Sequence, residues 1–263
     1  MGNALKRMVF QPPSQPTYEC DSRFIWLTTR RRQRIPAFFI DIGANLTVIF
    51  SHGNAEDIGM VIEYFKEVAC LWNCNFFVYD YVGYGHSSGK PSEQGVYDSI
   101  EAAFDYLTQQ LGMPAASIVA YGRSLGTGAS CHLACKHKLA GMILQSGLTS
   151  IHRVGLNTRF SLPGDMFCNI DKIGKVECPV FIIHGTKDEI VPVHHGMELY
   201  NRCPVSVTPY WVEGGGHNNL ELLGRRAFYE NVARFLKFIR ARSTQLELRS
   251  PNTLCSSASL SAR

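Results

Sequence analysis

The sequence predicts an α/β fold, in which a mostly parallel, doubly wound β-sheet has helices on both faces and a short cap. Short apolar runs alternate regularly with longer amphipathic segments of helical periodicity, which is typical of repeated strand–helix crossovers. Some of the runs, such as LTVIFS at 46–51, are largely apolar, as expected of parallel strands that are covered on both faces. The 263 residues are enough for one such domain to bury a sufficient core.

The predicted elements follow one another in a regular order. Apolar runs at 24–27 and 35–42, joined across an Arg-rich turn, predict an antiparallel edge to the sheet. Further strands are predicted at 46–51, 75–80, 118–121, 141–147, 179–184 and 206–212, and helices at 57–72, 92–111, 127–138, 194–201 and 221–242. Residues 148–176 contain several helix breakers and no clear strand, and therefore predict a short cap or insertion above the sheet edge.

The domain limits follow from changes in composition. We expect a single α/β domain at 20–242. Residues 1–19 are broken by three prolines and predict an irregular basic leader. Residues 243–263 are polar and rich in serine, so we expect a disordered tail there.

Composition and charge exclude several classes of protein. The net charge of +4 is too modest to indicate nucleic-acid binding. The sequence contains no run of about 18 apolar residues, so it predicts no transmembrane helix. The N-terminal stretch MGNALKRMVFQPPSQP has charge and proline where a signal peptide needs an apolar core. Nine cysteines without zinc-ribbon or disulfide-scaffold spacing predict reduced thiols in a cytoplasmic protein. We expect neither a metal nor an organic cofactor.

The stretch SIVAYGRSLGTGAS at 117–130 carries the clearest chemical signal. It predicts a buried strand, a sharp turn GRSLG and a helix start, which is the setting of a Gly-x-Ser-x-Gly nucleophile turn. Flanking glycines are needed because a Cβ there would collide with the neighbouring strand and helix. The turn exposes Ser124 Oγ and places the Leu125 N–H at a helix N-terminus, where it can face a developing oxyanion.

Three candidate catalytic residues each follow a different predicted strand: Ser124, Asp188 and His217. Their order along the chain, Ser, Asp, His, is the order expected of α/β hydrolases. The carboxyl ends of parallel strands meet at one edge of a sheet, so we expect the three side chains to converge. A serine nucleophile needs an imidazole to take its proton and a carboxylate to orient the ring. Glu189 and Asp171 are alternative acids, and Asp188 is preferred because it lies closest to a strand end.

The segment HGNA at 52–55 follows the strand at 46–51 and predicts the second part of an oxyanion hole. The backbone N–H of Asn54 or Ala55 is expected to join that of Leu125, and the sequence does not choose between them. His52 is better placed in this loop than as the general base. The glycine-rich run before His217 gives that histidine the freedom to point its ring at the serine.

Six sequence blocks occur in one order along residues 45–240: SHGNAED, YDYVGYGHSSGKPSE, YGRSLGTG, NIDKI, HGTKDE and EGGGHNNLEL. In these blocks the chain resembles the alpha/beta hydrolase domain-containing protein 17 family, serine hydrolases that act as protein depalmitoylases at the cytosolic face of membranes. The resemblance implies an α/β-hydrolase fold and a catalytic triad of Ser124, Asp188 and His217. It also implies that the substrate is an S-acylated cysteine thioester of a protein.

Two features differ from that family. The family carries a cysteine cluster at its extreme N-terminus, whereas this chain has only Cys20 nearby, and Arg123 stands where the family usually has glutamine. The turn GRSLG is also similar to that of Bem46-like and domain-containing protein 13 hydrolases. One alternative function is therefore a carboxylesterase or lipase of the Bem46-like type. A non-catalytic binding protein of the same fold is disfavoured, because such proteins typically lack a member of the triad.

The N-terminus leaves two interpretations open. Gly2 follows Met1, which partly matches an N-myristoylation motif, but Lys6 stands where that motif has Ser or Thr. An acyl chain at Gly2 and the nearby basic cluster would together favour peripheral contact with an anionic membrane at its cytosolic face. The other interpretation is that the arginines form a solvated turn between two strands.

Overall fold

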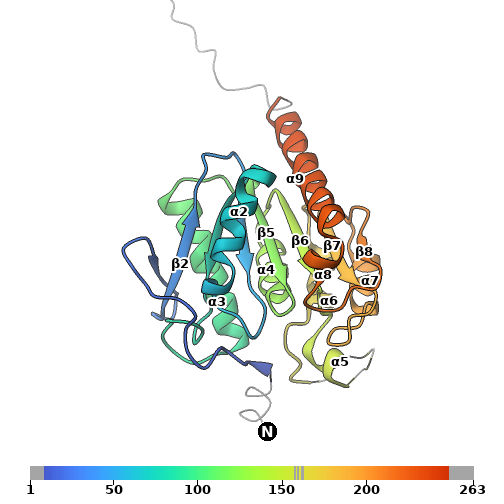
Figure 1. The fold of residues 1–263 in the computed structure, drawn as a ribbon, viewed down its shortest axis with the longest axis horizontal. Helices are drawn as coiled ribbons and strands as arrows, with labels where there is room; N and C mark the ends of the chain where they lie inside the picture. Colours follow the sequence, from blue (N-terminus) through green and yellow to red (C-terminus); the bar gives the residue numbers. More distant parts are fainter. Residues whose placement is uncertain (1–8, 157, 159, 161–162, 249–263) are drawn as a thin grey trace, which may run out of the picture.

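Eight strands form one sheet in the computed structural model, which describes residues 9–156, 158, 160 and 163–248 (Figure 1). The strands are β1 (Ile25–Thr28), β2 (Arg34–Ile40), β3 (Thr47–Ser51), β4 (Asn75–Tyr79), β5 (Ile118–Arg123), β6 (Gly141–Gln145), β7 (Val180–Gly185) and β8 (Tyr210–Val212). Their order is β1-β2-β4-β3-β5-β6-β7-β8. The pairs β1–β2 and β2–β4 are antiparallel, and the five following pairs are parallel. The predicted mostly parallel α/β fold with an antiparallel edge is confirmed.

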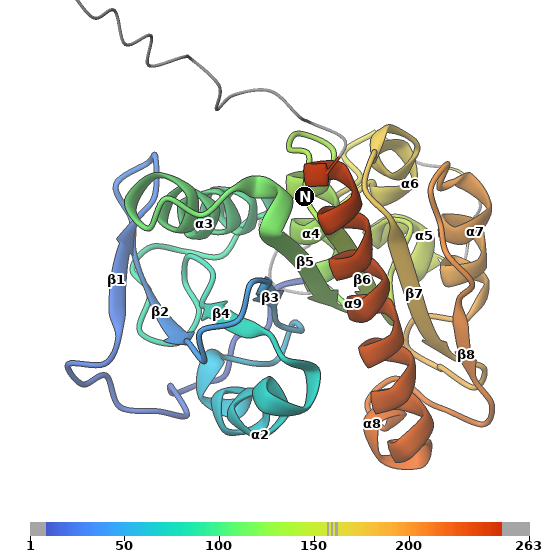
Figure 2. The same cartoon turned by 90° about the horizontal axis from the view of Figure 1, so that it is seen from above.

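Helices cover both faces of the sheet, as Figure 2 shows. One face carries α3 (Glu93–Asp105), α4 (Gly126–Ala134), α6 (Asn169–Lys172) and α7 (His194–Arg202), and the other carries α2 (Ile62–Trp72), α8 (Leu220–Leu223) and α9 (Arg225–Leu248). Short helical turns are η1 (Ile58–Met60), η2 (Tyr106–Gln110), η3 (Ala115–Ser117) and η4 (Ile173–Lys175). The short helix α5 (Ile151–Leu156) lies in the region predicted to form a cap. Each face of the sheet buries its own apolar cluster against its helices.

Four helices differ clearly from their predicted extents. The helix predicted at 127–138 is α4, which ends at Ala134, four residues before the predicted end. The predicted helix at 57–72 begins with the 3-10 turn η1 before α2, and the one at 92–111 ends in the π-turn η2. The predicted closing helix at 221–242 is interrupted at Gly224, whose φ of −116° and ψ of 38° are not helical. A Cβ on Gly224 would lie 2.8 Å from Tyr210 Oη, so β8 approaches the chain closely at this point. After the interruption, α9 continues to Leu248, past the predicted end at 242.

The last strand is shorter than predicted. The sequence predicted a strand at 206–212, but β8 begins at Tyr210, and Ser206 forms only an isolated bridge with Val180. Pro209 precedes the strand and has no backbone N–H, so it cannot donate a bond to a sheet ladder.

The irregular segment at 9–19 packs against the domain. Phe10 is buried, with its ring centroid 6.0 Å from that of Phe167. The backbone N–H of Thr17 donates to Asp57 Oδ2 at 2.7 Å, and the hydroxyl of Tyr18 donates to a carboxylate oxygen of Asp80. Both carboxylates belong to loops that follow strands of the sheet, so this segment lies against the loops at their carboxyl ends.

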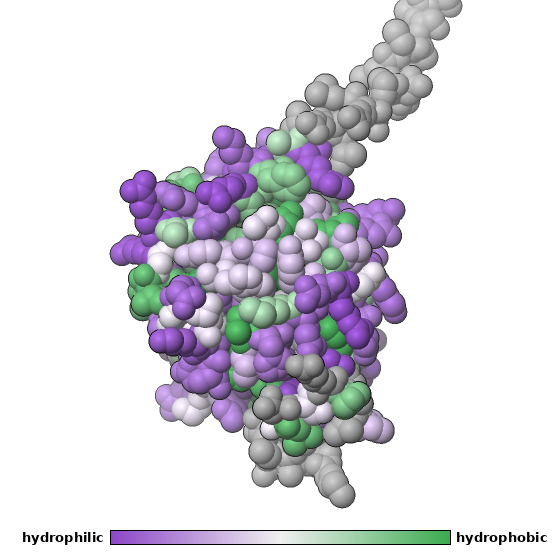
Figure 3. Space-filling view, turned by 90° about the vertical axis from the view of Figure 1, so that its right-hand side faces the viewer, coloured by the Kyte–Doolittle hydropathy of each residue, from purple (hydrophilic) through white to green (hydrophobic). Residues whose placement is uncertain are grey.

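The surface hydropathy and the lengths of the helices show how this chain could relate to a membrane. The face drawn in Figure 3 is mostly hydrophilic and is interrupted by small hydrophobic patches. Among the described residues, none of the helices is long and apolar enough to cross a bilayer. Gly2, the first part of the predicted leader and residues 249–263 of the predicted tail lie outside the described residues.

Candidate active site

The turn between β5 and α4 has the geometry expected of a nucleophile turn. Ser124 adopts a positive φ of 51°, which is unusual for a residue with a side chain. A Cβ on Gly122 would lie 2.4 Å from Gly126 O, and a Cβ on Gly126 would lie 2.0 Å from Ser51 O. Only glycine fits at these two positions, because the turn packs against its own helix and against the end of β3.

Ser124, His217 and Asp188 come together from three separate loops. Ser124 follows β5, Asp188 follows β7 and His217 follows β8. His217 Nε2 lies 2.9 Å from Ser124 Oγ, and His217 Nδ1 lies 2.7 Å from Asp188 Oδ2. Hydrogen bonds therefore join the hydroxyl, the imidazole and the carboxylate in a continuous row.

The Asp188 carboxylate is held in its ionised form. Its side chain is fully buried, and its Oδ1 accepts the backbone N–H groups of Ile190 and Val191 at 3.0 Å and 2.8 Å. Burial alone would raise the pKa of Asp188, but hydrogen bonds from His184 and His217 outweigh burial and hold the pKa well below its ordinary value. The carboxylate can thus orient the His217 ring and stabilise an imidazolium.

The structure distinguishes among the acids that the sequence left open. Of Asp188, Glu189 and Asp171, only Asp188 is hydrogen-bonded to His217 among the described residues. His184 lies inside β7, as predicted, and its Nε2 is 3.4 Å from Asp188 Oδ2 and 2.7 Å from the carbonyl oxygen of Val191. His184 therefore helps to hold the Asp188 carboxylate in place.

The candidate oxyanion donors border the same space as Ser124. Leu125 precedes the first residue of α4, where backbone N–H groups have no partner within the helix. Asn54 and Ala55 lie beside it in the wall of one cavity. The Asn54 side chain makes hydrogen bonds elsewhere, since its Oδ1 accepts the backbone N–H of Gln11 at 3.1 Å and the Tyr84 hydroxyl at 2.8 Å. The backbone N–H groups of Asn54 and Ala55 both stay candidates for the second donor.

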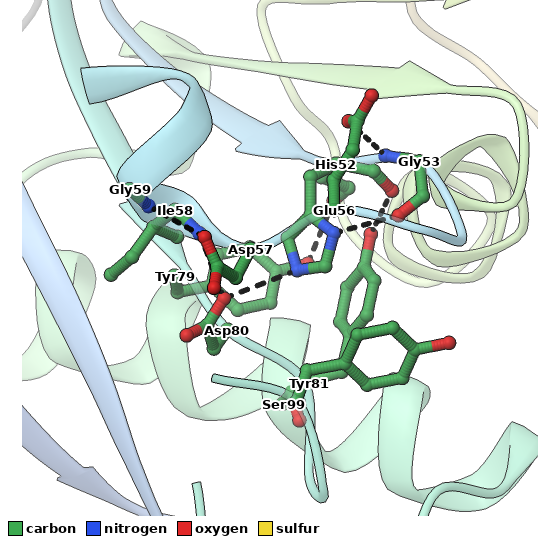
Figure 4. A network of polar contacts seen from close by, with 12 residues as sticks. His52, Gly53, Glu56, Asp57, Ile58, Gly59, Tyr79, Asp80, Tyr81 and Ser99 are labelled. Atoms are coloured by element: carbon green, nitrogen blue, oxygen red, sulfur yellow. Dashed lines mark hydrogen bonds and ion pairs between the residues drawn. The ribbon is translucent and has the colours of Figure 1, made fainter. Parts of the chain in front are cut away.

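Buried polar contacts hold the loop after β3 in place, as Figure 4 shows. His52 is fully buried, and its Nδ1 lies 2.8 Å from Gly53 O. The other ring nitrogen lies 3.4 Å from Asp80 Oδ1, which also accepts the Ile58 N–H at 3.0 Å. The Tyr81 hydroxyl donates to the carbonyl oxygen of His52 at 2.7 Å. His52 therefore helps to hold the backbone of this loop in place.

A cavity of about 840 Å³ opens beside the hydroxyl and the imidazole. Ser124 and His217 line it, and most of the remaining wall is apolar. The apolar lining residues include Met60, Leu148, Ile151, Val154, Leu156 and Ile190. This volume falls in the range of roughly 300–1,000 Å³ that is typical of small-molecule sites. The described residues contain no group of three or more His, Cys, Asp or Glu placed to hold a metal ion.

Sequence reasoning missed the side chains that fix the oxyanion loop from outside its motif. Gln11 and Tyr84 bind the Asn54 side chain across 43 and 30 residues of sequence, and no local pattern indicates such contacts. Glu56 was also missed, although its Oε2 accepts the Gly53 N–H at 2.8 Å. This contact is local, since it spans only three residues of sequence.

The chain is similar in sequence to several curated proteins. A family model described as "alpha/beta hydrolase fold" matches residues 47–166. Alpha/beta hydrolase domain-containing protein 17B of Homo sapiens is 43% identical over 211 residues, which are 79% of this chain and 73% of that protein. Protein aho-3 of Caenorhabditis elegans is 43% identical over 79% of this chain, and protein 17C of Xenopus tropicalis is 46% identical over 74%. The chain spans 63% and 62% of the lengths of these two relatives.

Solved structures share the fold. An esterase of Pyrococcus furiosus superimposes with a TM-score of 0.71 at 17% sequence identity, over 87% of this chain and 97% of that one. An esterase of Thermogutta terrifontis superimposes with a TM-score of 0.63 at 19% identity, over 83% of this chain and 99% of that one. At these identities the likeness concerns the fold alone.

Asp188→Asn tests the buried carboxylate. We expect a loss of about 2 kcal/mol in the free energy of unfolding at neutral pH, because hydrogen bonds to a charged acceptor are lost. The depressed pKa means that wild type loses this advantage as pH falls, by about 1.4 kcal/mol per pH unit below about pH 4. Urea unfolding at several pH values measures the gap between the two proteins, which should narrow in acid.

The exposed Asp41→Asn variant is the matched control for Asp188→Asn, with an expected change within about 0.5 kcal/mol. A gap between wild type and Asp188→Asn that stays constant from neutral pH to about pH 3 would contradict the prediction, since an ionised carboxylate would then not be the source of the stability.

Proposed function

Because the chain belongs to the alpha/beta hydrolase domain-containing protein 17 family, we propose that it is a serine hydrolase that cleaves S-acyl-cysteine thioesters of proteins. The family and the fold support a hydrolase. The observation that carries the serine mechanism is the row of hydrogen bonds from Ser124 through His217 to Asp188, which opens on a cavity. The substrate class is proposed from the family resemblance and from the apolar wall of that cavity.

In the proposed reaction, Ser124 Oγ attacks the thioester carbonyl while His217 Nε2, at 2.9 Å, takes the hydroxyl proton. The Leu125 N–H, with that of Asn54 or Ala55, stabilises the negative charge on the carbonyl oxygen. The C–S bond then breaks, the cysteine leaves as a thiol with the proton from the imidazole, and the acyl group stays on the serine. Water repeats the sequence, so that the fatty acid leaves and the serine is restored.

Thioesters suit this site for two reasons. A thiolate is a good leaving group, so its departure needs little help from a general acid. A long acyl chain is apolar, and the wall beside Ser124 offers it side chains such as Leu148, Ile151 and Val154. Palmitoylated proteins, with an S-linked long acyl chain, are therefore the proposed substrates.

The proposed place of action is the cytosolic face of an anionic membrane. The turn between β1 and β2 lies at the same edge as the active site, because β2 is antiparallel to β4 and Ala37 pairs with Tyr79 at the end of β4. Its exposed arginines are Arg30, Arg31 and Arg32. Arg30 and Arg31 also face carboxylates of α3, since Arg31 Nε lies 3.1 Å from Asp98 Oδ2 and Arg30 Nη2 lies 3.9 Å from Glu101 Oε2. Two residues of the cavity wall are also exposed apolar side chains, Leu156 at 62% and Ile190 at 52%. Cationic and apolar groups on one edge suit contact with anionic lipid.

Labelling by a fluorophosphonate probe, with thioester hydrolysis measured in parallel, tests the mechanism. We expect wild type to be labelled and Ser124→Ala to remain unlabelled, because the probe reacts with an activated serine. His217→Ala and Asp188→Asn should lower the hydrolysis rate by about 10⁴-fold or more. Ser117→Ala, which changes a partly exposed serine outside the cavity, is the matched control and should behave as wild type. A folded wild type that takes up no label would favour the non-catalytic binding protein.

A larger side chain at Gly155 tests the acyl site. Gly155 lines the cavity, and a Cβ there would meet no atom within 4 Å, so Gly155→Phe adds bulk to open space. We expect kcat/KM for a palmitoyl thioester to fall about tenfold or more, with little change for an acetyl thioester. Gly174→Phe, outside the cavity, is the control. Better turnover of short oxygen esters, unaffected by Gly155→Phe, would favour the carboxylesterase of the Bem46-like type.

Flotation with lipid vesicles tests the membrane surface. We expect binding to vesicles of phosphatidylserine and phosphatidylcholine, and a loss of up to about a hundredfold when Arg30, Arg31 and Arg32 are all changed to Gln, since each arginine contributes about 1 kcal/mol. The charge-matched control changes three exposed residues of α9 to Gln: Arg234, Lys237 and Arg242. Equal losses in the two triple variants would show that net charge, and no particular surface, governs binding.

A further inference from the structure

Arg123, the residue before the candidate nucleophile, lies between two carboxylates. Its Nη2 forms an ion pair with Glu56 Oε1, and its Nη1 lies 3.9 Å from Glu221 Oε1. The three side chains are only 22%, 15% and 18% exposed. They line a second cavity of about 360 Å³, which shares Glu56 and Arg123 with the cavity beside Ser124. The proposed reaction assigns no role to this group of charges.

Glu56 connects Arg123 to the oxyanion loop. One oxygen of its carboxylate faces the guanidinium, and the other accepts the Gly53 N–H at 2.8 Å (Figure 4). Gly53 directly precedes Asn54 and Ala55, the two candidates for the second oxyanion donor. The position of the Glu56 carboxylate therefore sets the direction of the peptide chain that presents those donors.

Glu221 connects the same arginine to the histidine loop. Glu221 is in α8, four residues after His217, and its Oε1 accepts a bond from Gln145 Nε2 at 2.6 Å. Gln145 in turn accepts the Tyr121 hydroxyl at 2.5 Å, and its backbone carbonyl accepts the Ser124 N–H at 2.9 Å. One row of polar contacts thus spans the loops of the histidine, the serine and the oxyanion donors.

We propose that Arg123 is a positioning residue that fixes the oxyanion loop through Glu56 and anchors α8, behind His217, through Glu221. This inference rests on the proposed hydrolase function, because it assigns Arg123 a role in that same site. Arg123 touches no reacting atom in this account. It holds the groups that do, and its single positive charge lies between a carboxylate of the loop after β3 and one of helix α8.

The loss of this ion pair would reach the reaction through the oxyanion loop. Replacing the arginine leaves two poorly hydrated carboxylates next to each other, so they repel and the loop that carries Glu56 shifts. The oxyanion forms only in the transition state, so misplaced donors weaken transition-state binding and leave ground-state binding of the acyl chain intact. The expected signature is a lower kcat with an unchanged KM.

Steady-state hydrolysis of an acyl thioester by Arg123→Gln, Arg123→Lys and Glu56→Gln tests the inference. We expect kcat to fall about 10- to 100-fold in Arg123→Gln, with KM within about twofold of wild type, because a small misplacement of catalytic groups costs about this much. Arg123→Lys keeps the charge and should recover part of the loss. The double variant Arg123→Gln/Glu56→Gln should be no slower than the worse single variant, since both changes break one contact.

The matched control is Arg226→Gln, which removes an exposed arginine paired with Glu230 on α9 and should leave kcat unchanged. A wild-type kcat in Arg123→Gln, or a rise in KM alone, would overturn the positioning role while the wild-type activity upheld the proposed function. Additive losses in the double variant would also overturn it. A folded wild type that neither hydrolyses thioester nor takes up a fluorophosphonate would remove the proposed function and this inference with it.

Discussion

The close approach of three backbone segments at the end of β5 is the constraint on which the rest of the site depends. A Cβ on Gly126 would lie 2.0 Å from Ser51 O, so helix α4 can begin directly against the end of β3 only because the residue is glycine. This contact brings the loop after β3 beside the N-terminus of α4. The Leu125 N–H, the candidate donors at Asn54 and Ala55 and the exposed hydroxyl of Ser124 consequently border one space.

The imidazole reaches that space because its loop is joined to the loop of the acid. Backbone contacts link them directly: the Lys187 N–H donates to Gly215 O at 2.8 Å, and the Gly214 N–H donates to Thr186 Oγ1 at 2.9 Å. The two loops follow the neighbouring parallel strands β7 and β8, so their ends lie side by side before any side chain is placed. The ring of His217 is therefore oriented by backbone as well as by the Asp188 carboxylate.

Local patterns predicted the parts of this arrangement that local chemistry determines. The strands, the nucleophile turn and the order Ser124, Asp188, His217 could be predicted because apolar runs and glycine positions report directly on backbone geometry. The break at Gly224 and the packing of Gln11 on Asn54 could not, since each depends on a residue distant in sequence. The late start of β8 could have been predicted from the sequence, because Pro209 directly precedes the strand. The apolar residues on both sides of Pro209 suggested one longer strand instead.

The oxyanion loop shows why residues outside a motif matter to its chemistry. The loop has no regular secondary structure between Ser51 and Ile58, so its order comes from side chains: Glu56 on the Gly53 N–H, and Gln11 with Tyr84 on the Asn54 amide. These contacts come from the loop itself, the leader and the segment after β4. A loop held in this way presents its N–H groups in a fixed direction before substrate binds, which is the condition for electrostatic stabilisation without reorganisation.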